Sequence, residues 1–228
     1  MINVIKSTAP RATFSYNDND IVAQIKDDFQ EMCFLCEEVA LRHSEVEHFH
    51  PVNGGWAERE HEWDNLFWIC GKCNKIKSNS YNKKNDVGII ENQILNNLID
   101  DVENILQLSL NIPQTSINIS IYTTDTILLQ KALITQEFLN KVYNGIGTTS
   151  LSYIDLRKMV VTEMAEFRSL LKEYENDKKP DWYKKQQEAE IAKRLSKRTK
   201  TSKSSFVGFK RYIVNNNLKY SYFKKYFD

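Results

Sequence analysis

Several features are missing from this sequence of 228 residues, and each absence narrows what the protein can be. There is no run of about 18 apolar residues, which excludes a transmembrane helix, and we expect no membrane partner. Residues 1–8 lack the apolar core of a secretory signal peptide, so we expect a cytoplasmic protein. No internal repeat and no long low-complexity segment is present. The length then allows one large globular domain or two small ones.

A large net charge is also missing, but the charges are unevenly distributed. The whole chain carries +1, whereas residues 178–228 contain 15 Lys and Arg against 4 Asp and Glu, and residues 1–177 contain 16 against 26. A basic C-terminal tail beside an acidic body suggests contact with nucleic acid or with an acidic partner surface. Solvated helices would give the same counts, so charge alone leaves these alternatives open.

No cysteine is left over from the two CxxC pairs, Cys33/Cys36 and Cys70/Cys73, which 33 residues separate. In a reducing compartment this pattern favours a metal over disulfides. Each CxxC turn lets two thiolates converge on one ion, and two such turns complete a tetrahedron around zinc. Redox dithiols or four buried free cysteines are the alternatives. A zinc site of this kind is structural and does not by itself imply catalysis.

The periodicity of apolar residues predicts a small head followed by a helical body. In the head we expect a helix from Asp20 to about Glu31, strands at 45–49 and 66–69, and a helix from Asn74 onward. After residue 88 the apolar spacing becomes helical. We expect body helices over Ile90–Leu106 and at about 124–143, 152–175, 181–198 and 204–215. The predicted fold class is α+β, with a zinc-stapled head at 1–88 and a mostly α-helical domain for partner and nucleic-acid recognition at 89–228.

Two adjacent residues in the head suit the hydrolysis of a phosphodiester. That reaction needs a base to activate water and a cation to neutralise the phosphate. Glu47 offers a hard oxygen ligand for magnesium or manganese. His48 is of the residue type whose ordinary titration near neutral pH suits a base. Asn74 directly follows the last cysteine, so the zinc site would fix its place, and its amide oxygen can serve as a second ligand.

A known family pattern runs through three stretches: Glu47-His48-Phe49-His50-Pro51, Asp64-Asn65-Leu66 and Cys70-x-x-Cys73-Asn74-x-x-Lys77. The pattern resembles the HNH endonucleases with the ββα-metal fold. The resemblance implies that Glu47 and Asn74 bind the catalytic ion. It also implies that His48 is the general base and that Asn65 orients this base. The family usually has Asp at the position of Glu47 and often His at that of Asn74.

Over about residues 29–80 the sequence is similar, more narrowly, to the HNH nuclease subunit of the Septu anti-phage system (PtuB-like). That resemblance implies a hetero-complex with an ATPase subunit and a role in phage defence. DNA is favoured over RNA as the substrate. An enzyme acting on RNA, and a zinc module that binds nucleic acid without cutting it, remain as alternatives. Lys77 and His50 are the candidate nucleic-acid contacts within the motif.

Overall fold

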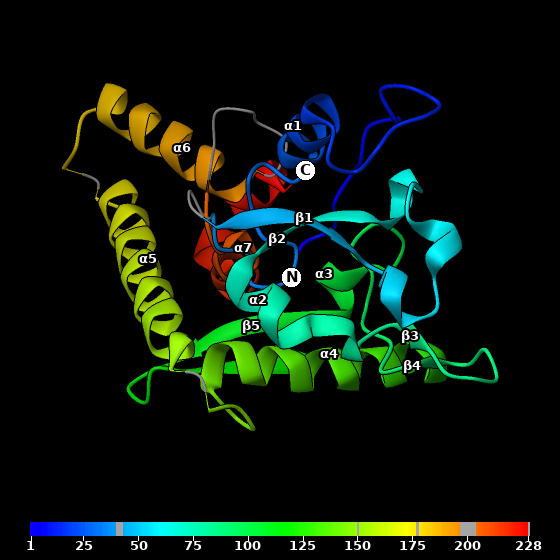
Figure 1. The fold of residues 1–228 in the computed structure, drawn as a ribbon. Coiled ribbons are helices and arrows are strands. Elements are labelled where there is room, and N and C mark those ends of the chain that lie inside the picture. Colours follow the sequence, from blue (N-terminus) through cyan, green and yellow to red (C-terminus); the bar gives the residue numbers. More distant parts are fainter. Residues whose placement is uncertain (40–42, 150, 177, 197–203, 228) are drawn as a thin grey trace.

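A computed structural model describes residues 1–39, 43–149, 151–176, 178–196 and 204–227 of the chain. The head contains one two-stranded antiparallel sheet with a helix on either side of it (Figure 1). Its elements are helix α1 (Asn19–Asp28), strands β1 (Ser44–His48) and β2 (Leu66–Cys70), and helix α2 (Gly71–Lys77). Short 3-10 turns follow β1 and α2, at Val52–Gly54, Ala57–Arg59, Trp63–Asn65 and Ser78–Ser80. The predicted α+β head is confirmed.

The pairing of β1 with β2 decides which side chains of β1 face the site. Glu47 lies opposite Phe67, and His48 opposite Leu66. All five residues of β2 are buried, which explains its unbroken apolar sequence. Strand β1 is only partly covered, and its side chains alternate between faces. Glu45 and Glu47 therefore share one face of the strand.

The body is built on a long helix and a β-hairpin. Helix α4 (Thr126–Asn144) packs against strand β6 (Ser116–Ile121), which pairs with β5 (Leu106–Asn111). The body continues with α5 (Ser152–Tyr174), α6 (Asp181–Leu195), α7 (Val207–Asn215) and a 3-10 segment at Leu218–Tyr226. The predicted helices at 124–143, 152–175, 181–198 and 204–215 are confirmed to within a few residues, although 197–203 lie outside the described residues. None of the helices in the described ranges is long and apolar enough to cross a membrane.

The predicted helix over Ile90–Leu106 is wrong. This segment contains strand β4 (Ile90–Glu91), which pairs with β3 (Lys83–Lys84), then an irregular stretch and the short helix α3 (Val102–Ile105). Side chains accept hydrogen bonds from nearby backbone amides in the irregular stretch: Oδ1 of Asn96 accepts from the amide of Leu98 (2.9 Å), and the carboxylate of Asp100 accepts from the amide of Asn96 (2.8 Å). Such bonds compete with helix formation. Apolar residues of this segment that are spaced as in a helix, such as Ile94 and Val102, are buried although most of the segment is not helical.

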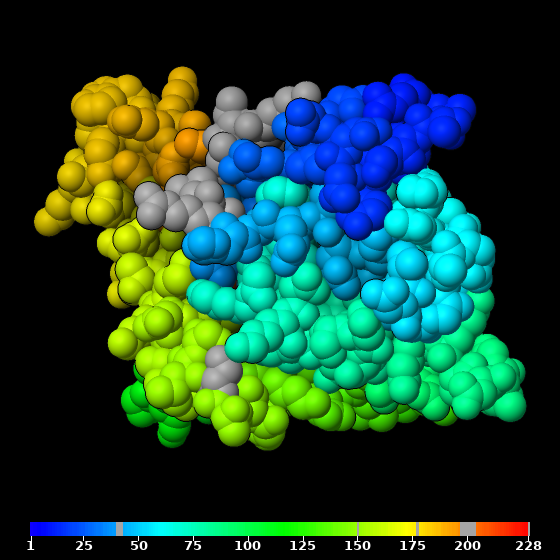
Figure 2. Space-filling view, in the orientation of Figure 1, coloured from blue at the N-terminus to red at the C-terminus, as the bar shows by residue number. Residues whose placement is uncertain are grey.

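The hydrophobic core does not stop at the predicted boundary after residue 88. One cluster of buried residues runs from α1 and β2 to α4 and α7, and includes Ile25, Phe67, Leu139 and Phe209. Figure 2 shows the blue and cyan surface of the head packed directly against the green surface of the body. A second, smaller cluster joins α5, α6 and α7. The division into domains at 1–88 and 89–228 stays a prediction. Residues of the head and of the body pack together in one hydrophobic core.

Candidate metal centre and active site

The four cysteines form a buried cluster at the junction of head and body. Their sulfur atoms all lie within 4.8 Å of one another, and the Sγ atoms of Cys36 and Cys70 are 3.7 Å apart. Tetrahedral zinc with Zn–S bonds of about 2.3 Å requires S···S distances of about 3.8 Å. The arrangement therefore fits a zinc ion, and the donor set is of the type that structural zinc takes.

Backbone contacts place the two cysteine turns against each other. The amide of Phe34 donates to the carbonyl of Trp68 (3.0 Å), which joins the first turn to strand β2. From the body, the hydroxyl of the buried Tyr143 on α4 donates to the carbonyl of Cys36 (2.5 Å). The cysteine centre therefore joins three parts of the chain that are far apart in sequence.

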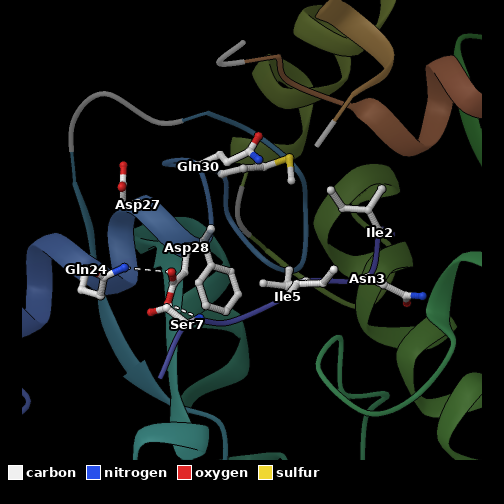
Figure 3. Close-up of a pocket in the computed structure, with 11 residues that line it drawn as sticks. Ile2, Asn3, Ile5, Ser7, Gln24, Asp27, Asp28 and Gln30 are labelled. Carbon is white, nitrogen blue, oxygen red and sulfur yellow. Dashed lines mark hydrogen bonds between the residues drawn. The ribbon is translucent and has the colours of Figure 1, made fainter. Parts of the chain in front are cut away.

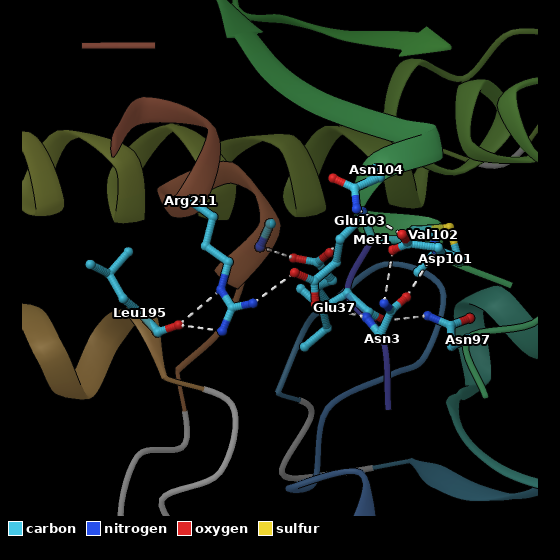
Figure 4. Close-up of polar contacts among 12 residues, drawn as sticks. Met1, Asn3, Glu37, Asn97, Asp101, Val102, Glu103, Asn104, Leu195 and Arg211 are labelled. Atoms are coloured by element: carbon cyan, nitrogen blue, oxygen red, sulfur yellow. Dashed lines mark hydrogen bonds and ion pairs between the residues drawn. The ribbon is translucent and has the colours of Figure 1, made fainter. Parts of the chain in front are cut away.

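A buried polar cluster ties the first cysteine turn to the C-terminal part of the chain (Figure 4). The carboxylate of Glu37 accepts a hydrogen bond from the amide of Gly208 (2.8 Å) and pairs with the amino group of Met1 (3.1 Å). Nearby, Arg211 forms an ion pair with Glu103 (2.7 Å). Parts of the basic tail are thus structural, because they are packed into the molecule rather than displayed on it.

His48 lies at the end of β1, with one nitrogen of its ring held by the loop that follows. Nε2 is 2.9 Å from the carbonyl oxygen of Glu60, and the ring packs edge-on against Tyr16 with centroids 4.8 Å apart. A carbonyl can only accept, so Nε2 must carry the proton. Nδ1 is then the unprotonated nitrogen of the neutral ring, and no described residue donates to it. The ring is set up to take a proton at Nδ1.

Glu47 is held from behind by Lys77. Nζ of Lys77 donates to Oε1 of Glu47 (2.7 Å) and to the carbonyl of His48 (2.9 Å), and the lysine side chain is fully buried. Burial lowers the pKa of Lys77, and the charge of Glu47 opposes that shift. Lys77 is a predicted nucleic-acid contact. A phosphate contact needs an exposed ammonium group, whereas that of Lys77 is buried against Glu47 and the carbonyl of His48.

The hydrogen bonds of Asn65 go to the loop after β1 and not to the ring of His48. Its Oδ1 accepts from the amide of His50 (2.7 Å), and its Nδ2 donates to the carbonyls of His50 (3.0 Å) and Arg59 (3.1 Å). The side chain is buried and spans the loop between β1 and β2. Because Glu60 directly follows Arg59, the bonds of Asn65 hold the segment whose carbonyl holds His48. The predicted orienting role thus has an indirect route in this geometry.

Asn74 lies on α2, beside the carboxylates of β1. Its Nδ2 donates to Oε1 of Glu45 (3.0 Å). A hollow of about 410 Å³ is lined by Glu45, Glu47, Gly71, Asn74, Lys75, Ser78 and Asn79. A second hollow of about 300 Å³ contains both Glu47 and His48. Sequence reasoning missed Glu45, although its spacing of two residues from Glu47 on a strand was the signal for a shared face.

A model of the HNH endonuclease family matches residues 31–80. This interval begins just before the first cysteine turn and ends just after α2, and it contains every candidate site residue described above. Residues 31–80 are therefore similar to the HNH endonuclease family. No curated protein and no solved structure matches the chain.

The residues of this HNH-like segment fit a divalent ion of the kind that HNH nucleases use. Oε1 of Glu47 is bonded to Lys77, and no described residue donates to Oε2. Nδ2 of Asn74 is hydrogen-bonded to Glu45, so the amide oxygen of Asn74 is the atom that can bind a metal ion. Both side chains line the same hollow, and both offer the hard oxygen atoms that Mg²⁺ and Mn²⁺ prefer.

His50, the other candidate nucleic-acid contact, is packed beside the site. Its ring lies against Trp56 with centroids 4.4 Å apart. Burial lowers the pKa of His50 to about 4, and the nearby charge of Arg59 acts in the same direction. The ring is therefore neutral at pH 7 and would meet a phosphate without a positive charge.

A further hollow, of about 530 Å³, lies outside the HNH motif residues, between the N-terminal segment and α1 (Figure 3). Its walls include Ile2, Ile5 and Met32 as well as Asp28. The carboxylate of Asp28 already accepts hydrogen bonds from Ser7 and Gln24. None of the candidate catalytic residues lines this hollow.

We predict one tightly bound zinc ion per chain, held by Cys33, Cys36, Cys70 and Cys73. Replacing Cys73 by Ser should abolish zinc retention and unfold the head, since the site joins three segments and structural zinc contributes folding free energy. Metal analysis of the purified protein and a urea titration would measure both effects. Zinc-free protein of undiminished stability would contradict the assignment.

We also predict that His50 makes stability depend on pH. Its pKa is about 4 in the folded protein against an ordinary value of 6.5, so its contribution is present above pH 6.5 and is lost as the pH falls towards 4. Because the ring is partly exposed, we expect a loss of about 1 kcal/mol between pH 7 and pH 5. Urea titrations at both pH values should show a smaller loss in His50→Gln than in the wild type.

The matched control is His61→Gln, because the side chain of His61 is 59% exposed. This variant should keep the pH dependence of the wild type. If His50→Gln and His61→Gln lose equal stability between the two pH values, the role given to His50 is wrong.

Proposed function

We propose that this protein is a metal-dependent endonuclease that hydrolyses phosphodiester bonds in nucleic acid, with DNA as the favoured substrate. The observation that carries the proposal is the state of His48 within the HNH-like segment. The carbonyl of Glu60 holds Nε2–H, which leaves Nδ1 basic, and Glu47 lines the same hollow. A positioned base beside hard oxygen ligands is the minimum that hydrolysis of a phosphodiester requires.

In the proposed mechanism Nδ1 of His48 takes a proton from the attacking water. Glu47 and Asn74 would hold the divalent ion, which would supply positive charge to neutralise the phosphate. Lys77 fixes the carboxylate of Glu47 and, through the carbonyl of His48, the main chain between the two residues. Asn65 holds the loop that keeps the ring of His48 in one orientation. The P–O bond to the leaving oxygen breaks as the new P–O bond forms.

The resemblance to the Septu nuclease subunit supports a narrower proposal. We infer that the protein acts in phage defence as the effector of a hetero-complex with an ATPase subunit. The support comes from the motif residues of the head, whereas the central helices of the body are the surface that we assign to partner docking. RNA as the substrate is the second candidate, because the chemistry at phosphorus is the same.

The basic tail is proposed to assist in binding nucleic acid, and its packing restricts which charges can do so. Nζ of Lys210 is buried against Glu163 at 2.5 Å, and Arg211 is committed to Glu103. Phe206 and Phe209 belong to the core shared with the head. Deleting the tail would therefore disturb folding, and the tail is better tested by changing its exposed lysines.

We predict that His48→Ala loses cleavage by roughly 10²- to 10⁴-fold, the usual contribution of a general base. Plasmid DNA and total RNA would be incubated separately with Mn²⁺ and the zinc-loaded protein, with and without its ATPase partner. Only the DNA should be cut. The control is His61→Ala, because the ring of His61 is 59% exposed and does not line the hollow that contains His48.

Three outcomes of this assay would count against parts of the proposal. Activity of His48→Ala close to that of the wild type would remove His48 from the mechanism. Cutting of RNA alone would favour the second candidate. A wild-type protein that binds DNA but cuts neither substrate, with the partner present, would support the non-cleaving alternative.

A further inference from the structure

Glu45 is an exposed carboxylate that the mechanism above does not use. It lies two residues before Glu47 on β1, and both line the hollow that contains Asn74. Its one hydrogen bond among the described residues is accepted by Oε1 from Nδ2 of Asn74, at 3.0 Å. The carboxylate therefore contacts a proposed ion ligand directly.

The chemistry of this bond decides which end of the Asn74 amide faces the hollow. An asparagine amide has a donating end and an accepting end of nearly the same shape, and rotation by 180° exchanges them. An ionised carboxylate can only accept, so it selects the orientation in which Nδ2 faces Glu45. Oδ1 must then point away from Glu45. Only the oxygen end of the amide can bind a cation.

Glu47 needs no such selection, because both ends of a carboxylate are oxygen atoms. Its orientation is nevertheless held by Lys77 from the buried side. Asn74 has no equivalent contact from the interior among the described residues, and its amide bond to Glu45 lies on the exposed side of the site. The two ligands are thus fixed from opposite sides by partners of opposite charge.

We propose that Glu45 is a positioning residue that turns the amide oxygen of Asn74 towards the divalent ion. The inference rests on the proposed function, because it assumes that Asn74 binds this ion. Glu45 acts through Asn74 and not as a ligand itself. Removing its carboxylate lets the amide populate the reversed orientation, in which the NH₂ group faces the ion.

A double-mutant cycle on Mn²⁺ affinity separates this role from a simple effect of charge. Mn²⁺ binding to the full-length, zinc-loaded protein would be measured by titration calorimetry for the wild type and for Glu45→Ala, each with Asn74 and with Asn74→Asp. We expect Glu45→Ala to weaken binding about fivefold, since a hydrogen bond of this kind is worth about 1 kcal/mol. With Asp at position 74 both ends are oxygen, so the same change should then weaken binding less than about twofold.

The control is Asp86→Ala, which removes one negative charge from an exposed position in the turn after β3. Its Mn²⁺ affinity should equal that of the wild type, and zinc content and thermal stability should be unchanged in all variants. An equal loss from Glu45→Ala in both backgrounds would show that Glu45 acts by charge or as a ligand, and would overturn the proposal. An unchanged affinity of Glu45→Ala would overturn it too.

These outcomes are distinct from a failure of the proposed function. A wild-type protein that retains zinc but binds no Mn²⁺ would overturn both the ion site and the role of Glu45. Mn²⁺ binding that is normal in Glu45→Ala and weak in Glu47→Ala would overturn the role of Glu45 alone.

Discussion

The positions of the candidate catalytic residues depend on the convergence of four thiols within 4.8 Å. The β1–β2 sheet has only two strands, and a hairpin of this size is marginally stable by itself. The cysteine centre fastens one end of that hairpin to the turn after α1 and to the start of α2. Tyr143 adds a contact from the body. Asn74 directly follows Cys73, so the position of the cysteine centre also fixes the position of this proposed ligand of the catalytic ion.

The candidate catalytic side chains are held in place mainly by backbone groups and buried side chains around them. A backbone carbonyl selects the tautomer of His48, a buried ammonium group holds Glu47, and an amide spans the loop between β1 and β2. Each of these contacts pairs a polar group that is at least partly buried, and leaving such a group unpaired would cost free energy. The same bonds therefore stabilise the fold and give the site one defined arrangement.

The sequence predicted the head better than the body, for physical reasons. The CxxC spacing and the apolar run of β2 are local signals, and both correspond to elements of the structure. The helix predicted over Ile90–Leu106 is wrong because Ile90, Ile94 and Leu98 imitate a helical stripe. The hairpin β5–β6 was missed because the alternation in Leu106–Asn111 is short. The burial of Lys77 and the bond between Glu45 and Asn74 could not be predicted either, since each joins residues about 30 positions apart. Motif spacing specifies which residues meet, but not which of their atoms are already engaged.

We propose that one zinc centre positions a separate site for a divalent ion at Glu47 and Asn74. Crystals of the zinc-loaded protein soaked in Mn²⁺ would test it most directly, by anomalous diffraction at the absorption edges of the two metals. We expect a zinc peak among the four cysteines and a manganese peak beside the carboxylate of Glu47 and the amide oxygen of Asn74. Manganese only at the cysteines, or only at sites away from His48, would contradict the account.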